Sequence, residues 1–423
     1  MFFCFLVVGG ALTVYLLMSA EGVKYDIKNS GIVPTSSLYI ETIPKNADTA
    51  IDNGAPTTSA LKKLTTGTHS LVWTYNGMMT RQATFKVTAP QSFVLPPLRL
   101  IPVKPNLRAL TESANLICDG SKNLLLWTNQ PKPNELLLSL VNSGNQSGAL
   151  VYKAAGAISA CQISLDEKLA ALRVFGAWLI INLPDGTVTT RLTTTFASWL
   201  NEKYFWDKNK KLYSYNETKP VVVDIKPATK VVGSSEKLFA LIYNATLKMY
   251  ILNKKNKAAD GFVEVAPLPA DLKIIDYKFI DAYLVIYAVK NNQPWLYFLH
   301  PDSGAIKYAY IGNDIFWHPG YRRWFIRFGK NLQQVENLGD KPNTATILPK
   351  PENPTPDDRS SLVYYLQDNK IMAQETNGLW EDKITVATFP DKIVHFWMGP
   401  EQQLIVWLDD SVAQRLISLD LLP

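Results

Sequence analysis

The sequence offers few residues whose types and spacing suit catalysis. No two histidines stand at the spacing of a metal site, and no familiar nucleophile or phosphate-binding motif occurs. Adjacent carboxylates occur at Asp357-Asp358 and Asp409-Asp410, but neighbours on a strand point to opposite faces, so each pair is a poor acid–base dyad. The four histidines are His69, His300, His318 and His395. We expect no catalytic residues, no metal and no cofactor, and a structural role for His69.

A cluster of aromatic and cationic side chains is the best candidate for a ligand-binding site. It consists of Trp317, His318, Tyr321, Arg322, Arg323 and Trp324. Aromatic faces beside arginines suit recognition of a sugar or a peptide, although a β-rich core also takes up tryptophans. Two further basic clusters, 208–211 and 254–257, are predicted to lie in turns. Such charge runs are usually solvated, and the functional alternative is contact with anionic glycans or lipid head groups.

Composition limits the class of partner. The chain has 423 residues, a formal net charge of +6 and 47% hydrophobic residues, so it can bury a sizeable core. This charge is short of what a nucleic-acid-binding protein usually carries, and we expect no nucleic-acid partner. A mild positive surplus fits ordinary solubility, an anionic envelope polymer or a membrane surface.

The elements that would position these residues repeat along the chain. From residue 114 onward, apolar strands recur about every 40 residues, each entered through a polar turn and followed by a second strand. Four short strands in such a period are typical of a propeller blade. The strands begin at Leu124, Leu169, Tyr204, Leu238, Tyr283, Trp324, Leu362 and Leu404. We predict a β-propeller over residues 92–423 with eight blades, or with seven because the proline-rich segment 348–359 reads as a loop.

The last repeat lacks room for an outer strand before the sequence ends at residue 423. An open sheet edge invites aggregation, so a propeller needs a strand from elsewhere to complete its last blade. We expect residues 93–103, which read FVLPPLRLIPV, to supply that strand.

A small β-domain is predicted at residues 36–91, because short alternating runs are separated by strong turn signals such as Asn53-Gly54. These residues resemble the PEGA domain. The resemblance rests on Pro44–Ala47, Ile51–Gly54, Leu61–Leu64 with Gly67 and His69, and Tyr75–Gly77. The tetrad reads PKNA and the "T-P" step is displaced to Pro56-Thr57, so the match is incomplete. The resemblance implies a β-sandwich that acts as a spacer or binding module in a prokaryotic envelope, and no catalysis.

The first residues predict a membrane anchor. Residues 1–20 contain an uncharged apolar run about long enough to span a bilayer as a helix. A cleaved signal peptide is the alternative, but no basic residue precedes the run. Residues 21–35 are predicted to be a polar linker. We therefore expect a single-pass protein of the cell membrane with its bulk outside the cytoplasm.

Cysteine usage leaves one question open. Cys4 lies in the apolar run, while Cys118 and Cys161 lie on the first strands of successive repeats. The last two form a disulfide only if their Cα atoms are closer than about 7 Å, and buried free thiols are the commoner state.

Together these features predict an all-β protein: a PEGA-like β-sandwich followed by a seven- or eight-bladed β-propeller, with one N-terminal transmembrane helix. The expected function is a binding or scaffolding role toward an envelope protein or an anionic glycan. The alternative is an envelope enzyme, a glycan lyase or hydrolase, which would need polar residues converging at the channel of the propeller.

Overall fold

The chain folds into β-strands. The computed structural model describes residues 23–422 apart from short segments at 27–30, 59–60, 89–90, 112, 119–122, 141–147, 165, 184, 200–203, 210, 217–218, 223–229, 234–237, 245, 253–257, 265–270, 281–282, 301–302, 319–321, 330, 336–337, 339–342, 350–351, 377–382 and 411–412. Over these residues the one helical element is the 3-10 helix η1 (Pro400–Gln402). No helix in this described part is both long and apolar enough to cross a membrane. The predicted anchor, residues 1–20, lies outside the described residues.

Two sheets packed face to face form the small domain. One contains β1 (Val23–Asp26), β2 (Gly31–Tyr39), β5 (Leu61–Thr65) and β8 (Ser92–Val94). The other contains β4 (Asp48–Ile51), β6 (Gly67–Thr74) and β7 (Arg81–Val87), and a short pair joins β3 (Thr42–Ile43) to β9 (Leu98–Arg99). Alternate residues of β7 are buried, as expected for a strand with one face on a core. That core includes Leu38, Leu71 and Trp73, each 0% exposed.

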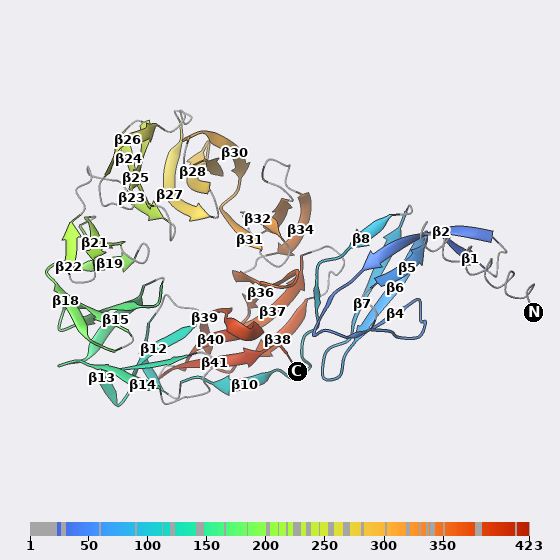
Figure 1. The fold of residues 1–423 in the computed structure, drawn as a ribbon, viewed down its shortest axis with the longest axis horizontal. Coiled ribbons are helices and arrows are strands. Elements are labelled where there is room, and N and C mark those ends of the chain that lie inside the picture. The colour runs from blue at the N-terminus through green and yellow to red at the C-terminus, as the bar shows by residue number, and fades with distance from the viewer. Residues whose placement is uncertain are drawn as a thin grey trace, which may run out of the picture.

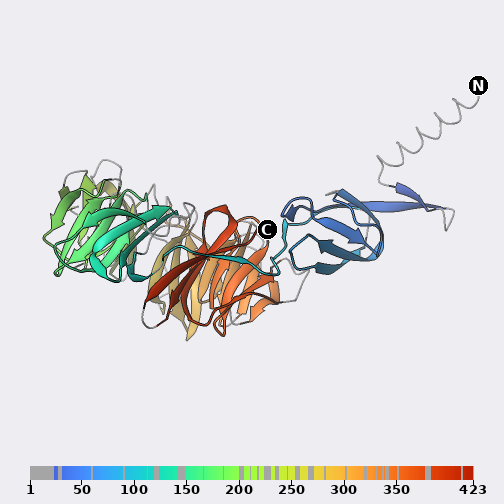
Figure 2. The same ribbon diagram turned by 90° about the horizontal axis from the view of Figure 1, so that it is seen from below.

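The predicted polar linker is wrong in part, because residues 23–26 and 31–34 pair as a hairpin. β2 then continues into the small domain as its first core strand. The β1–β2 hairpin lies at the end of the small domain that is farthest from the C-terminal domain (Figures 1 and 2).

A buried histidine stabilises the tight turn between β4 and β5 of the small domain. The two left-handed residues of this turn are Asp52 and Asn53, with φ of 50° and 61°. The Asp52 carboxylate accepts hydrogen bonds from His69 Nδ1 at 2.7 Å and from the Ser70 backbone N–H at 2.8 Å. His69 Nε2 lies 2.8 Å from the Thr65 carbonyl, so both ring nitrogens face acceptors. Burial opposes its charge, but these bonds outweigh burial and raise the pKa of His69.

The C-terminal domain repeats one antiparallel unit of four strands. Units 1 to 7 take their strands in sequence order, unit 8 takes one strand from before the repeats, and the units succeed one another around a common centre (Figure 1). Units 1 to 4 consist of β11 (Ala114–Ile117), β12 (Leu124–Asn129), β13 (Lys132–Leu140) and β14 (Ala149–Lys153); β15 (Ile158–Ile163), β16 (Leu169–Val174), β17 (Ala177–Asn182) and β18 (Val188–Leu192); β19 (Phe196–Trp199), β20 (Tyr204–Asp207), β21 (Leu212–Asn216) and β22 (Lys219–Val222); β23 (Lys230–Gly233), β24 (Leu238–Asn244), β25 (Thr246–Leu252) and β26 (Ala258–Glu264).

Units 5 to 8 continue the pattern to the end of the chain. They consist of β27 (Lys273–Ile280), β28 (Tyr283–Lys290), β29 (Gln293–Leu299) and β30 (Ile306–Ile311); β31 (Asp314–His318), β32 (Arg323–Phe328), β33 (Asn331–Val335) and β34 (Asn343–Pro349); β35 (Glu352–Pro356), β36 (Leu362–Gln367), β37 (Lys370–Glu375) and β38 (Ile384–Thr388); β39 (Lys392–Met398), β40 (Gln403–Asp409) and β41 (Gln414–Asp420) with β10 (Asn106–Ala109). The predicted loop at 348–359 is wrong, because β35 forms there and pairs with β36. This arrangement is propeller-like.

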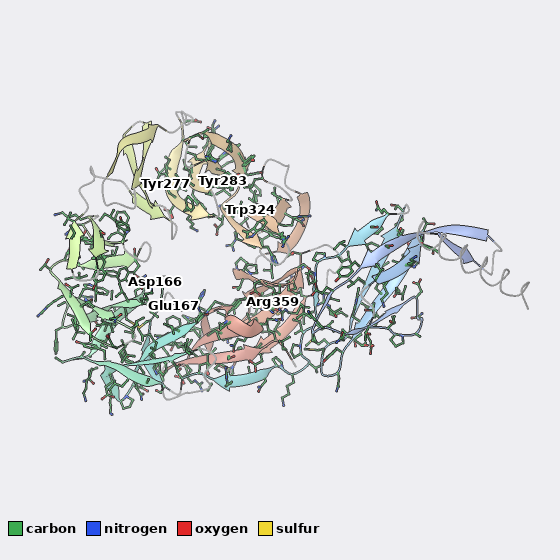
Figure 3. The ribbon with its side chains drawn as sticks, in the orientation of Figure 1. Asp166, Glu167, Tyr277, Tyr283, Trp324 and Arg359 are labelled. Atoms are coloured by element: carbon green, nitrogen blue, oxygen red, sulfur yellow. A yellow bond between two sulfur atoms is a disulfide. The ribbon has the colours of Figure 1, made fainter. Side chains whose placement is uncertain are left out.

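Neighbouring units pack because their middle strands are apolar on both faces. In β28, Leu284 and Ile286 pack into the core of unit 5 beside Tyr277, while Val285 and Tyr287 pack against Trp324 of unit 6. Successive side chains of a strand point to opposite faces, so one run of apolar residues fills two cores. Tyr277 and Trp324 mark the two units in Figure 3.

A strand from before the repeats completes the last unit, but not the predicted one. Residues 93–103 do not pair with unit 8: β8 pairs with β2, and β9 pairs with β3, so these residues belong to the small domain. The boundary between the domains therefore lies after residue 103 and not at residue 92. β10 instead pairs antiparallel with β41, and Ala114 of β11 pairs with Gln414, which links unit 8 to unit 1.

The pairing of β10 predicts a contrast between two proline substitutions. The Leu110 N–H donates to the Leu416 carbonyl, and alternate residues of an antiparallel strand face the same partner. Arg108 therefore points its N–H at β41 and Leu107 points its N–H away. We expect Arg108→Pro to lower the free energy of unfolding by about 1–3 kcal/mol more than Leu107→Pro, measured by urea denaturation. Equal losses would contradict the role of β10 as a hydrogen-bonded closing strand.

Cys118 and Cys161 form a disulfide, which settles the open question of their pairing. Their Cα atoms lie 5.0 Å apart and the bond joins unit 1 to unit 2. The same two units are also linked at their turns, where Asn123 Nδ2 donates to the Glu167 carboxylate at 3.2 Å. Glu167 and the neighbouring Asp166 are labelled in Figure 3.

Candidate functional site

Four ionisable side chains are buried where the small domain meets unit 7. Arg81 begins β7 and Arg99 ends β9, while Asp357 follows β35 and Glu375 ends β37. Their exposed fractions are 4%, 0%, 0% and 1%. Burying an ionised side chain costs free energy unless a partner of opposite charge and hydrogen bonds compensate it. We name this set of four side chains the ionic joint.

Arg99 and Asp357 form a bidentate pair. Arg99 Nε makes an ion pair with Asp357 Oδ2, and Arg99 Nη2 donates to Asp357 Oδ1 at 3.2 Å. The carboxylate also accepts the Arg359 N–H at 2.9 Å and the Tyr364 hydroxyl at 3.2 Å. Burial, and then the charge of Asp357, raise the pKa of Tyr364 well above its usual value, so Tyr364 remains a neutral donor. The planar guanidinium fits this geometry, which a lysine would not.

Arg81 and Glu375 form the second half of the ionic joint. Arg81 Nη2 lies 4.0 Å from Glu375 Oε1, and the Ser361 hydroxyl donates to Glu375 Oε2. Burial raises the pKa of Glu375 to about 7, although the Arg81 charge and the Ser361 hydrogen bond act in the opposite direction.

The raised pKa of Glu375 predicts a pH dependence. The folded state keeps this proton up to about pH 7, whereas the unfolded chain loses it above about pH 4.5. Stability from this group is therefore full below pH 4.5 and is lost as pH rises toward 7, on the order of 2–3 kcal/mol. The experiment measures urea unfolding of wild type and Glu375→Gln across this range. We expect the stability of wild type relative to Glu375→Gln to fall as pH rises; a constant difference would contradict the assignment.

An apolar contact accompanies the ionic joint. Ile101, which follows β9, is 0% exposed and packs in a core cluster with Leu362, Tyr364 and Phe396 of units 7 and 8. Met79 of the small domain packs against the same cluster, and its N–H donates to the Ile101 carbonyl at 2.8 Å. The small domain thus shares a core with the propeller-like domain, which ties their orientations together.

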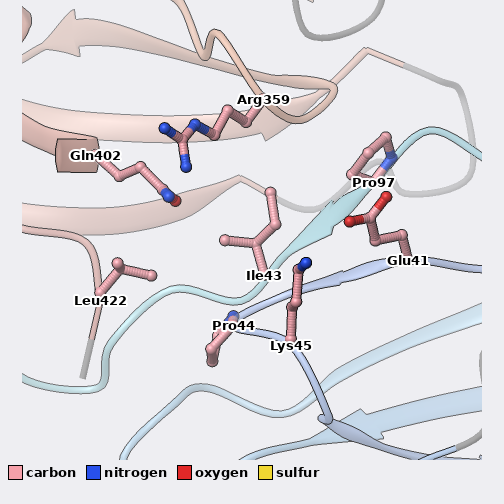
Figure 4. A pocket seen from close by; sticks show the side chains of 8 residues that line it. All are labelled: Glu41, Ile43, Pro44, Lys45, Pro97, Arg359, Gln402 and Leu422. Carbon is pink, nitrogen blue, oxygen red and sulfur yellow. The ribbon is translucent and has the colours of Figure 1, made fainter. Parts of the chain in front are cut away.

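An open cleft of about 450 Å³ lies beside the ionic joint. Both domains line it (Figure 4). The lining residues are Glu41, Ile43, Pro44, Lys45 and Pro97 from the small domain, and Arg359, Gln402 and Leu422 from the other. The cleft offers one carboxylate and two cations around an apolar floor. Among the described residues, no group of three or more His, Cys, Asp or Glu side chains is placed to hold a metal ion.

The structure separates the residues of the predicted ligand site. His318 is 0% exposed and Trp324 is 5% exposed, so both are core residues and unavailable to a ligand. Burial lowers the pKa of His318 to about 4, and its Nε2 lies 2.9 Å from the Leu362 carbonyl of unit 7. Trp317 is 37% exposed and packs on Trp324, with ring centroids 5.2 Å apart.

Two further residues of the predicted ligand site lie at the start of β32. Arg322 is exposed in the turn before this strand and Arg323, its first residue, is half-buried, whereas Tyr321 lies outside the described residues. A ligand role for Trp317, Arg322 and Arg323 stays a prediction. Of the other basic clusters, Lys208 and Lys211 are exposed in the turn between β20 and β21, and 254–257 lie outside the described residues.

Comparison with known proteins identifies the fold and no family. No protein-family model matches the sequence, and no curated protein is similar to it at a significant level. The structure is similar to that of dipeptidyl peptidase 4 from Porphyromonas gingivalis, a β-propeller protein, with a TM-score of 0.50 and 10% identity. That likeness covers 70% of this chain and 56% of the peptidase chain, and at this identity it concerns the fold alone.

Two further solved structures are similar at lower scores. Sqt1 from Saccharomyces cerevisiae has a TM-score of 0.49 and 11% identity, over 76% of this chain and 100% of that chain. The Dos1 propeller has a TM-score of 0.43 and 11% identity, over 74% of this chain and 94% of that chain.

Proposed function

We propose that this chain is a binding and scaffolding protein in which a closed eight-bladed propeller is held at a fixed orientation by a rigid spacer. The ionic joint carries this proposal. Arg99 and Asp357 are both 0% exposed and form an ion pair, and Ile101 of the small domain packs in the core cluster of units 7 and 8. An interface that buries charge and shares a core resists the relative motion that is usual between domains.

The proposed location is the outer side of a prokaryotic membrane. Residues 1–20 would be a single-pass helical anchor, and the small domain would be the PEGA-like spacer between that anchor and the propeller. Two observations support this location. The β1–β2 hairpin leads away from the propeller-like domain (Figure 2), and the Cys118–Cys161 disulfide is typical of oxidising compartments.

The proposed partner is an envelope protein or an anionic glycan, and the proposed activity is binding without catalysis. The experiment retains envelope proteins and glycans on the full chain in detergent micelles. We expect saturable retention of one component. Retention of no component would overturn the binding role, and release of shortened glycan products would favour the alternative of a glycan lyase or hydrolase.

A further inference from the structure

A second open groove lies on units 2 and 3, far in sequence from the ionic joint. It has a volume of about 580 Å³ and is lined by Gly176–Trp178 and by residues 191–195. The first segment contains the end of the turn between β16 and β17, and the second contains the end of β18 and its connection to β19. In these antiparallel units both connections lie at one end of the strands, together with the turn between β20 and β21. The Lys208 N–H donates to the Thr195 carbonyl, so the turn between β20 and β21 of unit 3 lies beside the two segments that line this groove.

The groove presents hydroxyl and indole groups. Thr193 and Thr195 are exposed, and Thr194 donates its hydroxyl to Asp207 Oδ2 at 2.5 Å, which fixes the segment. Trp178 lines the groove, and its indole N–H is buried without a hydrogen-bond partner among the described residues. A buried donor with no partner costs free energy, and a ligand hydroxyl or anion can supply the acceptor.

Phe175 supplies an aromatic face next to the groove. This residue is 79% exposed and adopts a left-handed φ of 50°, a conformation that non-glycine residues rarely take. Its ring lies against Gly156, where an added Cβ would come within 2.1 Å of the ring. An exposed, supported aromatic ring in a strained turn is a feature typical of binding sites.

The rim of the groove is cationic. Arg191 is exposed and makes no ion pair within the described part of the chain. The Lys208 N–H donates to the Thr195 carbonyl at 2.8 Å, which places this exposed lysine beside the groove. The nearby carboxylate, Asp207, is 3% exposed and accepts hydrogen bonds from the Thr194 hydroxyl and the Lys211 N–H, which offset part of its charge.

We propose that this groove binds an anionic saccharide. A sugar ring would stack on Phe175, its hydroxyls would bond to Thr193, Thr195 and the Trp178 indole, and its carboxylate or phosphate would pair with Arg191 and Lys208. The polar lining favours a saccharide over an apolar peptide side chain, and the cations select an acidic sugar. This inference rests on the proposed binding function and gives it a ligand class and a site.

Isothermal titration calorimetry on the full chain in detergent tests the proposal. The probes are hexagalacturonate for the carboxylate source, a phosphorylated oligosaccharide of similar length for the phosphate source, a neutral hexaose, and a short single-stranded DNA. We expect one or both anionic saccharides to bind, with weaker binding at about 300 mM than at about 50 mM salt. Absence of saccharide binding, equal binding of the neutral hexaose, or tighter binding of DNA would overturn the proposal.

Three surface variants locate the binding. Arg191→Gln and Phe175→Asn, the latter because asparagine tolerates a left-handed φ, should each weaken binding by about tenfold or more. Lys392→Gln removes an exposed cation of β39 in unit 8, away from the groove, and should bind as wild type. If Lys392→Gln weakens binding and Arg191→Gln does not, the site is wrong. If Arg191→Gln still retains its envelope component as wild type does, the binding function survives and the groove assignment fails.

Discussion

Replacing Arg99 with methionine will lower the free energy of unfolding by about 3–5 kcal/mol, because it leaves the Asp357 carboxylate buried without its cation. Methionine has similar length and no charge, so the loss reports on the ion pair more than on packing. Urea denaturation followed by tryptophan fluorescence measures the change. We also expect proteases to cut between the domains, since the pair links β9 to unit 7.

Two matched controls show whether the loss of stability comes from the burial of the ion pair or from the loss of any ion pair. Lys132 and Glu135 form an ion pair at 3.4 Å, but the Lys132 side chain is 63% exposed, so Lys132→Gln should cost less than about 1 kcal/mol. Adding Asp357→Asn to Arg99→Met removes the orphaned charge and should recover part of the loss. A cost for Arg99→Met no larger than that for Lys132→Gln would contradict the ionic joint.

Removing the disulfide will have an effect of similar size. The Cys118–Cys161 bond closes a loop with a sequence separation of 43 residues, for which chain entropy gives about 4 kcal/mol. The double variant Cys118→Ala/Cys161→Ala, and wild type treated with a reductant, should both unfold at lower urea concentration. Cys4→Ser should unfold as wild type does. A reductant that leaves the wild-type transition unchanged would show that the two cysteines are not bonded in solution.

The repeated units could be predicted because the pattern of apolar residues within each unit predicts its own strands. A strand such as Tyr283–Lys290 has apolar residues on both faces, and only a sheet covered on both sides buries such a run. The small domain was predictable for a similar reason, since its tight turns carry residues that tolerate positive φ. The closing strand β10 could not be predicted, because Asn106–Ala109 is short and largely exposed and has no signal stronger than that of its neighbours.

The ionic joint could not be predicted, because its partners are 258 residues apart in sequence. One signal was present: Arg99 is a lone arginine within the apolar segment 93–103, and a cation in such a run needs a buried partner. The predicted ligand site is wrong for His318 and Trp324 because the sequence pattern there fits two different environments. Aromatic residues next to arginines mark a surface site or a core with equal strength, and only packing against the neighbouring unit decides between them.

A distance distribution between the two domains tests the rigid spacer most directly. Spin labels at Lys86→Cys in β7 and Lys392→Cys in β39, both exposed positions, report it by double electron–electron resonance in a Cys4→Ser background. The disulfide keeps Cys118 and Cys161 unlabelled. We expect one narrow distribution for the wild-type joint and a broad one after Arg99→Met. A broad distribution with the joint intact would contradict the claim that the small domain holds the propeller at a fixed orientation.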